Sequence, residues 1–558
     1  MKKLYFTTIL LVLNLCVYFG IRSMWSGIIR VTFNELPYIL LGVLVLITIS
    51  SALFIINNKK SLIIFILGLV INLLFLGLNG YIISNTLDST PYFIRESLYN
   101  LLFVLGIAFI VFLWIQIPKY TKLQKNVVHS TLLIILCVLG VAIRFDIRLF
   151  NDITCTPVVY AVGENYQITF TTNSKGTAWV SIDGKEYNDT YAGYRKTENT
   201  IHKISVPMDV LDNAKEYTLN TRAMYLRGPY CALQGKIISK TFNWKGVNPD
   251  DGINYYLISD NHTTIETPYQ AATYFGDSLD FLVSCGDTVN WIDRESDLRC
   301  LLKLAGKITN GEIPVIYARG NHETKGVRAH EYYQYVGANG EKFYYTFRLK
   351  NIWGVVLDVG ENHGDKYSEF YGAAKFTQYR KSQTKFLDKI LANAEEEFDA
   401  PGVDYRIAIC HIPLTAKYLT DHAASYKDEW VERLNQMKIT MLYGGHVHEL
   451  LYMDSNYQNG NIATQCEEYS GKSKNNKTRI MGLADFPAIL VSRRAAGQTL
   501  DNKEYVFDDG FIGLAVSTDG NETVMKYTNE KHEVLDNIIS AWYSYIQYGS
   551  EIRVKNVK

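Results

Sequence analysis

Five short blocks of histidine, aspartate and asparagine mark the second half of this 558-residue chain. Each block directly follows an apolar run typical of a buried strand, and these runs span residues 255–259, 281–285, 314–318, 406–410 and 440–443. The candidate site residues in the blocks are Asp260, His262, Asp287, Asn321, His322, His411, His446 and His448. In open α/β sheets ligands bind beyond the carboxyl ends of the strands, where loops meet. We therefore expect the five blocks to converge on one site.

The residue types in these blocks suit divalent metal ions. Imidazoles and carboxylates together favour zinc, manganese or iron over calcium or magnesium. In an extended segment residues i and i+2 point the same way, so Asp260 with His262, and His446 with His448, can both face a site. Glycines precede three of the blocks and would let backbone and metal approach closely. A single histidine would more often be structural, but five of the chain's eleven histidines fall in these blocks.

The ordered blocks D-x-H, G-D, G-N-H-E, H and G-H-x-H resemble the signature of the calcineurin-like metallophosphoesterase superfamily. That resemblance implies a four-layer α/β/β/α domain with two divalent metal ions (Mn, Zn or Fe), a bridging hydroxide as the nucleophile, and phosphate esters as substrates. The implied ligands of the first metal are Asp260, His262, Asp287 and His448, and those of the second are Asp287, Asn321, His411 and His446. His322 matches the family's histidine that protonates the leaving oxygen or stabilises the transition state, with Glu323 as a candidate partner behind it. The catalytic residues are thus expected to be His322 and the bridging Asp287.

Two positions depart from the pattern of the purple acid phosphatases, a branch of this superfamily. Those enzymes usually have D-x-G in the first block and a tyrosine in G-D-x-x-Y, which gives them their colour. This chain has His262 at the first position and Asn290 at the second. An Fe(III)–tyrosinate centre is therefore not expected, and we predict a colourless enzyme.

Five apolar stretches without Asp, Glu, Lys or Arg precede residue 144, at 4–21, 36–56, 61–84, 98–117 and 127–143. The first four are about long enough to cross a hydrocarbon core of roughly 30 Å as helices, and the fifth is shorter. Their lack of ionisable groups favours an anchor in the lipid bilayer over a transporter. The distribution of lysine and arginine in the loops places the amino terminus inside. An odd number of spans then predicts a multi-pass protein of the cell membrane whose catalytic domain is extracellular.

Residues from about 154 to 244 alternate between apolar and polar side chains in short runs, which predicts a small β-sandwich. Asp183-Gly184 is a strong hairpin signal within it. The segment resembles the fibronectin type III-like domain that precedes the catalytic domain in purple acid phosphatases. Cys155 and Cys231 flank the segment, and a disulfide between them is one alternative that spacing alone leaves open.

The predicted organisation is thus multidomain. It consists of a five-helix transmembrane region at 1–150, a β-sandwich at 151–248, a metallophosphoesterase domain at 249–530, and a carboxyl-terminal helix or tail at 531–558, where apolar residues follow a helical spacing. An amphipathic helix is expected at about 376–394 and a polar surface loop at 456–477. Formal net charge is zero, with 56 basic and 56 acidic residues, so no nucleic acid partner is predicted.

The leading interpretation is a membrane-anchored phosphatase or phosphodiesterase acting on phosphate mono- or diesters. One alternative is a diphosphatase or phosphodiesterase for lipid-linked or nucleotide substrates, because five spans exceed what an anchor needs. Another is a membrane protein whose outer domain senses phosphate without catalysis, which the complete ligand blocks disfavour. The substrate, the metal pair and the oligomeric state stay open at this stage.

Overall fold

The computed structural model describes residues 151–191, 195–227, 232–249, 252–417, 425–448, 450–453, 479–480, 484–491, 499–500, 503–504, 510–535, 538–540, 543–548 and 550–556. The chain divides into two compact units, Met1–Arg144 and Phe145–Lys558, and all described residues belong to the second unit. The five expected membrane spans and the polar loop at 456–477 lie outside the described residues. Among the helices of the described part, none has both the length and the apolar character that a membrane crossing requires.

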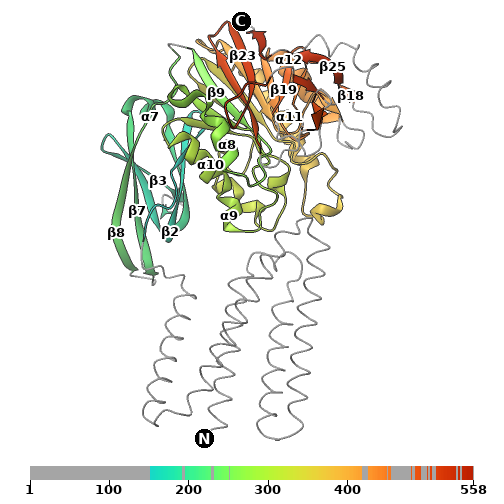
Figure 1. Cartoon of the computed structure of the whole chain (residues 1–558). Helices are drawn as coiled ribbons and strands as arrows, with labels where there is room; N and C mark the ends of the chain where they lie inside the picture. The colour runs from blue at the N-terminus through green and yellow to red at the C-terminus, as the bar shows by residue number, and fades with distance from the viewer. Residues whose placement is uncertain are drawn as a thin grey trace, which may run out of the picture. The chain divides into compact units, whose positions relative to one another are not determined.

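The larger sheet runs through the whole described unit (Figure 1). Its strands, in spatial order, are β26 (Ile552–Lys555), β23 (Glu522–Asn529), β22 (Ile512–Thr518), β9 (Ile253–Ile258), β10 (Phe281–Ser284), β11 (Pro314–Tyr317), β1 (Val158–Val162), β2 (Asn165–Ile182), β7 (Glu216–Arg227) and β8 (Ala232–Asn243), with β3 (Lys185–Asn188) and β6 (Asn199–Pro207) also paired to β2. β9, β10 and β11 are parallel to one another, so their carboxyl ends share one edge. This edge carries three of the five blocks.

The smaller sheet supplies the other two blocks. Its order is β12 (Tyr345–Leu349), β13 (Ile352–Leu357), β14 (Tyr405–Cys410), β16 (Met441–Gly444), β19 (Ala488–Leu490) and β17 (Leu451–Met453). Successive side chains along β14 point to opposite faces: Ile407 and Ile409 join the core shared with the larger sheet, whereas Ala408 packs toward the helices. The two sheets therefore pack face to face.

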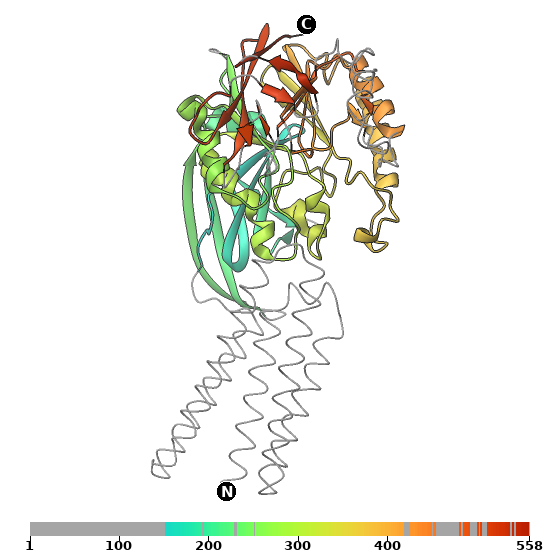
Figure 2. The same cartoon turned by 45° about the vertical axis from the view of Figure 1, so that its right-hand side comes forward.

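Helices cover the outer face of each sheet. α8 (Glu266–Ala272) and α10 (Cys300–Thr309) contact strands of the larger sheet. α11 (Phe376–Ala392) and α12 (Ser425–Gln436) pack together and cover the smaller sheet (Figure 2). The order helix, sheet, sheet, helix is the mixed α/β architecture expected from the blocks, and α11 confirms the amphipathic helix expected at 376–394.

The β-rich segment before residue 248 joins the catalytic sheet directly. β1 pairs in parallel with β11, with Val159 opposite Pro314, and the buried residues of both belong to one core. Asp183 and Gly184 form the expected hairpin turn with φ of 46° and 77° between β2 and β3. The fibronectin-like sandwich and the domain boundaries remain predictions, while the pairing shows that no break in the sheet separates this segment from the residues that follow.

Two expectations about local structure need correction or comment. The helix predicted at the carboxyl end is wrong, because residues 538–548 contain the antiparallel strands β24 (Ile538–Ser540) and β25 (Tyr543–Tyr548), and β26 then extends the larger sheet. These residues are mostly isoleucine and tyrosine, whose strand preference outweighs their helical spacing.

Cys155 carries a free thiol 3.1 Å from Thr171 Oγ1, and Cys231 lies outside the described residues.

Candidate metal centre

All eight candidate residues follow the carboxyl ends of strands that converge on one place. Their positions are Asp260 and His262 after β9, Asp287 after β10, Asn321 and His322 after β11, His411 after β14, and His446 and His448 after β16. The first three strands belong to the larger sheet and the last two to the smaller one. The centre is therefore built by both sheets, at the edge where their parallel strands end.

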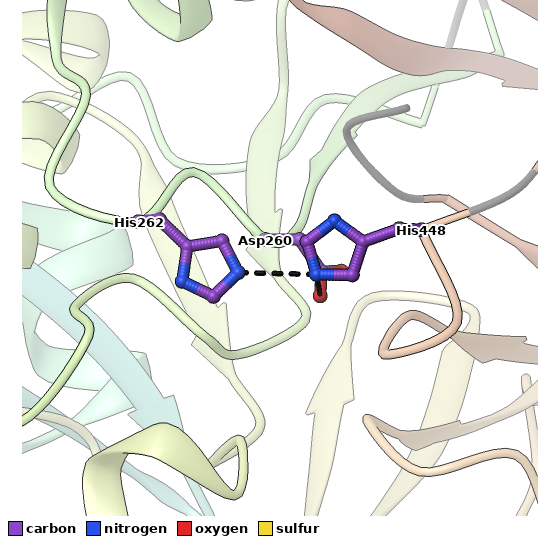
Figure 3. Close-up of side chains that lie close together, drawn as sticks. All are labelled: Asp260, His262 and His448. Atoms are coloured by element: carbon purple, nitrogen blue, oxygen red, sulfur yellow. Dashed lines mark hydrogen bonds and ion pairs between the residues drawn. The ribbon is translucent and has the colours of Figure 1, made fainter. Parts of the chain in front are cut away.

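One cluster consists of Asp260, His262 and His448 (Figure 3). Potential ligand atoms of the three residues all lie within 4.8 Å of one another. The Nε2 atoms of His262 and His448 are 3.2 Å apart, and His448 Nε2 lies 3.5 Å from Asp260 Oδ1. These are the ligands expected for the first metal, apart from Asp287.

A second cluster consists of Asp287, His411 and His446. His411 Nε2 lies 3.1 Å from Asp287 Oδ2, and His446 Nδ1 lies 2.9 Å from Asn321 Oδ1. Asp287 also forms a third cluster with His262 and His322. The carboxylate of Asp287 is thus the group that lies beside both expected metal positions.

The local backbone of the ligand loops is strained, which the extended-segment argument did not foresee. Five of the expected ligands have left-handed backbone with positive φ: Asp260 (53°), His262 (41°), Asp287 (51°), His446 (75°) and His448 (55°). Non-glycine residues rarely adopt this region, and such strain concentrates at functional sites. The expectation that Asp260 with His262, and His446 with His448, lie in extended segments was therefore wrong. Both pairs of side chains nevertheless reach the centre.

The glycines beside the blocks allow the close approach that was expected of them. A Cβ on Gly320 would lie 2.1 Å from Asp287 Oδ1, and a Cβ on Gly445 would lie 2.1 Å from Ser259 Oγ. Ser259 Oγ in turn donates to Asp260 Oδ2 at 2.6 Å. Any side chain at these two glycines would displace an aspartate of the centre.

Glu323 supports Asp287 rather than His322. Its buried carboxylate accepts hydrogen bonds from the backbone N–H groups of Asp287 (3.0 Å), Thr288 (2.6 Å) and Gly320 (3.0 Å), and from Thr288 Oγ1 (2.7 Å). The expected contact behind His322 is instead made by a backbone carbonyl. Nδ1 of His322 donates to Asn290 O at 2.7 Å, which leaves Nε2 facing the centre, 3.9 Å from Asp287 Oδ2.

Electrostatics divide the histidines into two kinds. Burial lowers the pKa of His262 to about 4 and the pKa of His446 to about 3, so both imidazoles keep free lone pairs at neutral pH. Burial would also lower the pKa of His411, but the carboxylates of Asp287 and Asp260 raise it to about 10. Burial alone would raise the pKa of Asp287, yet His411 holds it well below its usual value. Asp287 therefore keeps its negative charge at neutral pH, and this charge attracts cations to the centre.

The donor set fits divalent cations. Among the described residues no group donates a hydrogen bond to the buried Asp260 Oδ1, which lies beside two imidazole nitrogens that face each other at 3.2 Å. Two nitrogens bound to one tetrahedral ion at 2.0–2.1 Å would be about 3.3 Å apart. The orphaned oxygen and the facing nitrogens are the arrangement that a shared cation would stabilise.

Residues 253–450 match the family model described as calcineurin-like phosphoesterase. The chain carries a calcineurin-like phosphoesterase domain. It is a phosphoester hydrolase, and its family implies divalent metal ions at a His/Asp centre of this kind. Among curated proteins none matches the sequence significantly.

Several solved structures are similar to parts of this chain. A purple acid phosphatase from yellow lupin (Lupinus luteus) seeds is 15% identical, with 68% of this chain and 73% of that chain covered and a TM-score of 0.43. PhoD is 12% identical, with 73% and 93% covered and a TM-score of 0.39. A dimetal phosphatase from Danio rerio is 13% identical, with 51% and 98% covered and a TM-score of 0.33.

Two residues beside the centre escaped the sequence analysis. Glu361 accepts a hydrogen bond from Asn321 Nδ2 at 3.0 Å, and Asn362 Nδ2 lies 3.0 Å from His446 Nε2. Both follow β13, an apolar run like those before the five blocks. The strand-end signal that marks the five blocks is therefore present here too, since polar residues follow a buried apolar strand.

Proposed function

We propose that this phosphoesterase hydrolyses phosphate mono- or diesters with two divalent metal ions held by seven of the eight candidate residues, all except His322. The observation that supports this proposal best is the position of Asp287, which belongs to two of the three ligand clusters. In this proposal the first ion is held by Asp260, His262 and His448, the second by Asn321, His411 and His446, and Asp287 serves both. When bound, the ions would lower the pKa of a water molecule and neutralise the charge that develops on the phosphoryl oxygens.

His322 is proposed to move the proton that the leaving group requires. Its Nδ1–H is held by Asn290 O, so proton exchange takes place at Nε2, which faces the centre. Its side chain is about a third exposed, at 30%, which leaves it open to a substrate. Glu323 keeps the backbone of Asp287 in place during this exchange.

A substrate panel on the purified full chain tests the proposal. The chain, stripped with a chelator and reloaded with manganese, zinc or iron, should bind two ions and hydrolyse aryl phosphate monoesters, diesters or both. Asp287→Asn serves as the matched control with the smallest change in shape. Turnover that is absent with all three metals and both ester classes would favour phosphate binding without catalysis.

We further propose that residues 1–150 anchor the protein in the cell membrane with the catalytic domain outside. The five apolar stretches and the bias of basic residues support this topology. Intact cells should then hydrolyse an added, membrane-impermeant aryl phosphate ester in a manner that depends on Asp287. Activity that appears only after cell lysis would contradict the outside location.

A further inference from the structure

Two adjacent residues after β13, Glu361 and Asn362, lie behind two expected ligands of the second metal. Both are nearly buried, with 3% and 8% of their surface exposed. Glu361 Oε2 accepts the Nδ2–H of Asn321, which turns Asn321 Oδ1 away from Glu361 and toward His446 Nδ1 at 2.9 Å. An amide held by its nitrogen in this way presents its oxygen in one direction only.

Asn362 approaches the other nitrogen of the same imidazole. Its Nδ2 lies 3.0 Å from His446 Nε2, while its buried Oδ1 has no hydrogen-bond partner in the part of the chain that the structure describes. Without a cation the contacts require a proton on His446 Nδ1, which donates to Asn321 Oδ1, and a lone pair on Nε2, which accepts from Asn362. This arrangement satisfies the ring but leaves the Asn362 oxygen unpaired.

A cation between His446 Nδ1 and Asn321 Oδ1 would reverse these requirements. Two ligand atoms bound about 2.1 Å from one ion at right angles are about 3 Å apart, which fits the 2.9 Å separation. Nδ1 must then offer its lone pair, so the ring proton moves to Nε2 and needs an acceptor. A half-turn of the Asn362 amide brings its unpaired oxygen to that proton, and it fits the same space because the NH2 and oxygen ends of an amide have nearly the same shape.

We propose that Glu361 and Asn362 are positioning residues of the second metal site: Glu361 orients the Asn321 amide, and the Asn362 oxygen holds His446 in the tautomer that binds metal through Nδ1. This inference rests on the proposed two-metal function. Metal-bound histidines generally donate their second N–H to such a partner, which fixes the tautomer and the ring orientation.

Arg380 on α11 fixes the backbone of this segment by hydrogen bonds. Its buried guanidinium donates through Nη1 to Val359 O at 3.1 Å and to Glu361 O at 3.0 Å. Lys325 Nζ lies 3.5 Å from Glu361 Oε2 and balances its charge. Glu361 and Asn362 therefore lie on a fixed segment of chain, as residues that position ligands require.

Metal titration of the purified full chain tests the role of Asn362. We expect Asn362→Leu to weaken the second equivalent of zinc or manganese by about 10- to 100-fold, the range seen when such partners are removed. Asn362→Asp should bind the second equivalent within about threefold of the wild type, because a carboxylate also accepts the Nε2 proton. If Asp weakens binding as much as Leu does, the amide donates in the loaded protein and the inference is overturned.

Glu361 has its own pair of variants. Glu361→Ala should weaken binding of the second equivalent of metal about tenfold or more. Glu361→Gln should keep most of the wild-type affinity, because its amide oxygen still accepts a hydrogen bond from Asn321. Asn393→Leu is the matched control for Asn362→Leu. Among the described contacts, Asn393 Nδ2 donates only to Lys389 O at the end of α11. Unfolding midpoints in chelator check that all variants fold.

The outcomes separate this inference from the proposed function. If the wild type binds two ions and the Leu and Ala variants bind both with unchanged affinity, the inference fails and the proposed function stands. If the wild type itself binds no ion, the proposed two-metal function is overturned together with the inference.

Discussion

Replacing Glu323 by glutamine is the sharpest probe of how the centre is held together. The Glu323 carboxylate is fully buried and accepts four hydrogen bonds, two at each oxygen. In the variant an NH2 group must replace one oxygen. At the Oε1 position the Thr288 hydroxyl can rotate to accept from it, so the Thr288 N–H is the one donor that loses its acceptor. This is the less harmful of the two orientations.

The expected loss of stability follows from the one buried donor, the Thr288 N–H, that loses its acceptor. One buried donor left without a partner costs about 1–3 kcal/mol, and the remaining bonds lose the strength that the charge gave them. We expect Glu323→Gln to destabilise the metal-free protein by about 2–3 kcal/mol, and Glu323→Ala by about 4 kcal/mol or more. Because Asp287 N and Gly320 N bond the same carboxylate, metal affinity should fall as well, by about 10-fold or more.

An opposing effect makes this prediction refutable. Burial raises the pKa of Glu323, and the nearby Asp287 carboxylate raises it further, so removal of the charge relieves an unfavourable interaction. Urea unfolding followed by tryptophan fluorescence in chelator measures the balance, with the exposed Glu341→Gln as the control. A Glu323→Gln variant as stable as the wild type, with unchanged metal affinity, would show that charge burial outweighs the four hydrogen bonds.

Four further predictions concern separate parts of the protein. His322→Ala should keep both metals by elemental analysis yet slow turnover by about 10²–10⁴-fold, most for esters with poor leaving groups, and equal slowing for all leaving groups would argue against proton transfer. Asp287→Asn should lose metal together with activity, and two bound ions per chain in that variant would refute the shared role. The iron-loaded protein should show no strong visible absorption band, because Asn290 stands where the tyrosine ligand would be; a tyrosinate band would contradict this. Burial lowers the pKa of Lys203 to about 7 against an ordinary value of about 10.5, so the unfolded chain binds the extra proton and stability should rise by about 1–2 kcal/mol from pH 7 to 9. Lys203→Met should lack this rise in urea midpoint, and an identical pH dependence of the two proteins would exclude Lys203 as its source.

The candidate site was largely predictable because its signal is local. Each block directly follows a strand-forming run, and the structure brings residues such as Asp260, Asp287 and His411 together at the strand ends. Glu361 and Asn362 follow β13 in the same way, but they belong to none of the five blocks, so no local motif set them apart from other polar residues. The positive φ values of the ligands could not be predicted from the sequence, because aspartate and histidine are enriched in the left-handed region but adopt it in only a small minority of cases.

The fold was less predictable where pairing is distant. No local pattern indicates that β1 lies beside β11, because parallel neighbours need only similar apolar runs. The apolar residues near the carboxyl end have a helical spacing, but their isoleucines and tyrosines also suit strands, and residues 538–548 contain the antiparallel pair β24 and β25 instead. Helical spacing alone therefore does not show whether such residues form a helix or pair as strands.

The position of β1 in the larger sheet has a consequence for the order of folding. β1 is synthesised well before its parallel partner β11. Val159 of β1 pairs with Pro314 of β11, which lies 155 residues later in the chain. Closing a chain segment of that length costs about 4–5 kcal/mol of entropy, which slows the pairing. Until β11 is synthesised, the five buried residues of β1 have an open edge that can pair with another chain. Fragments that end before residue 314 should therefore aggregate through this strand, and synthesis past that point removes the hazard.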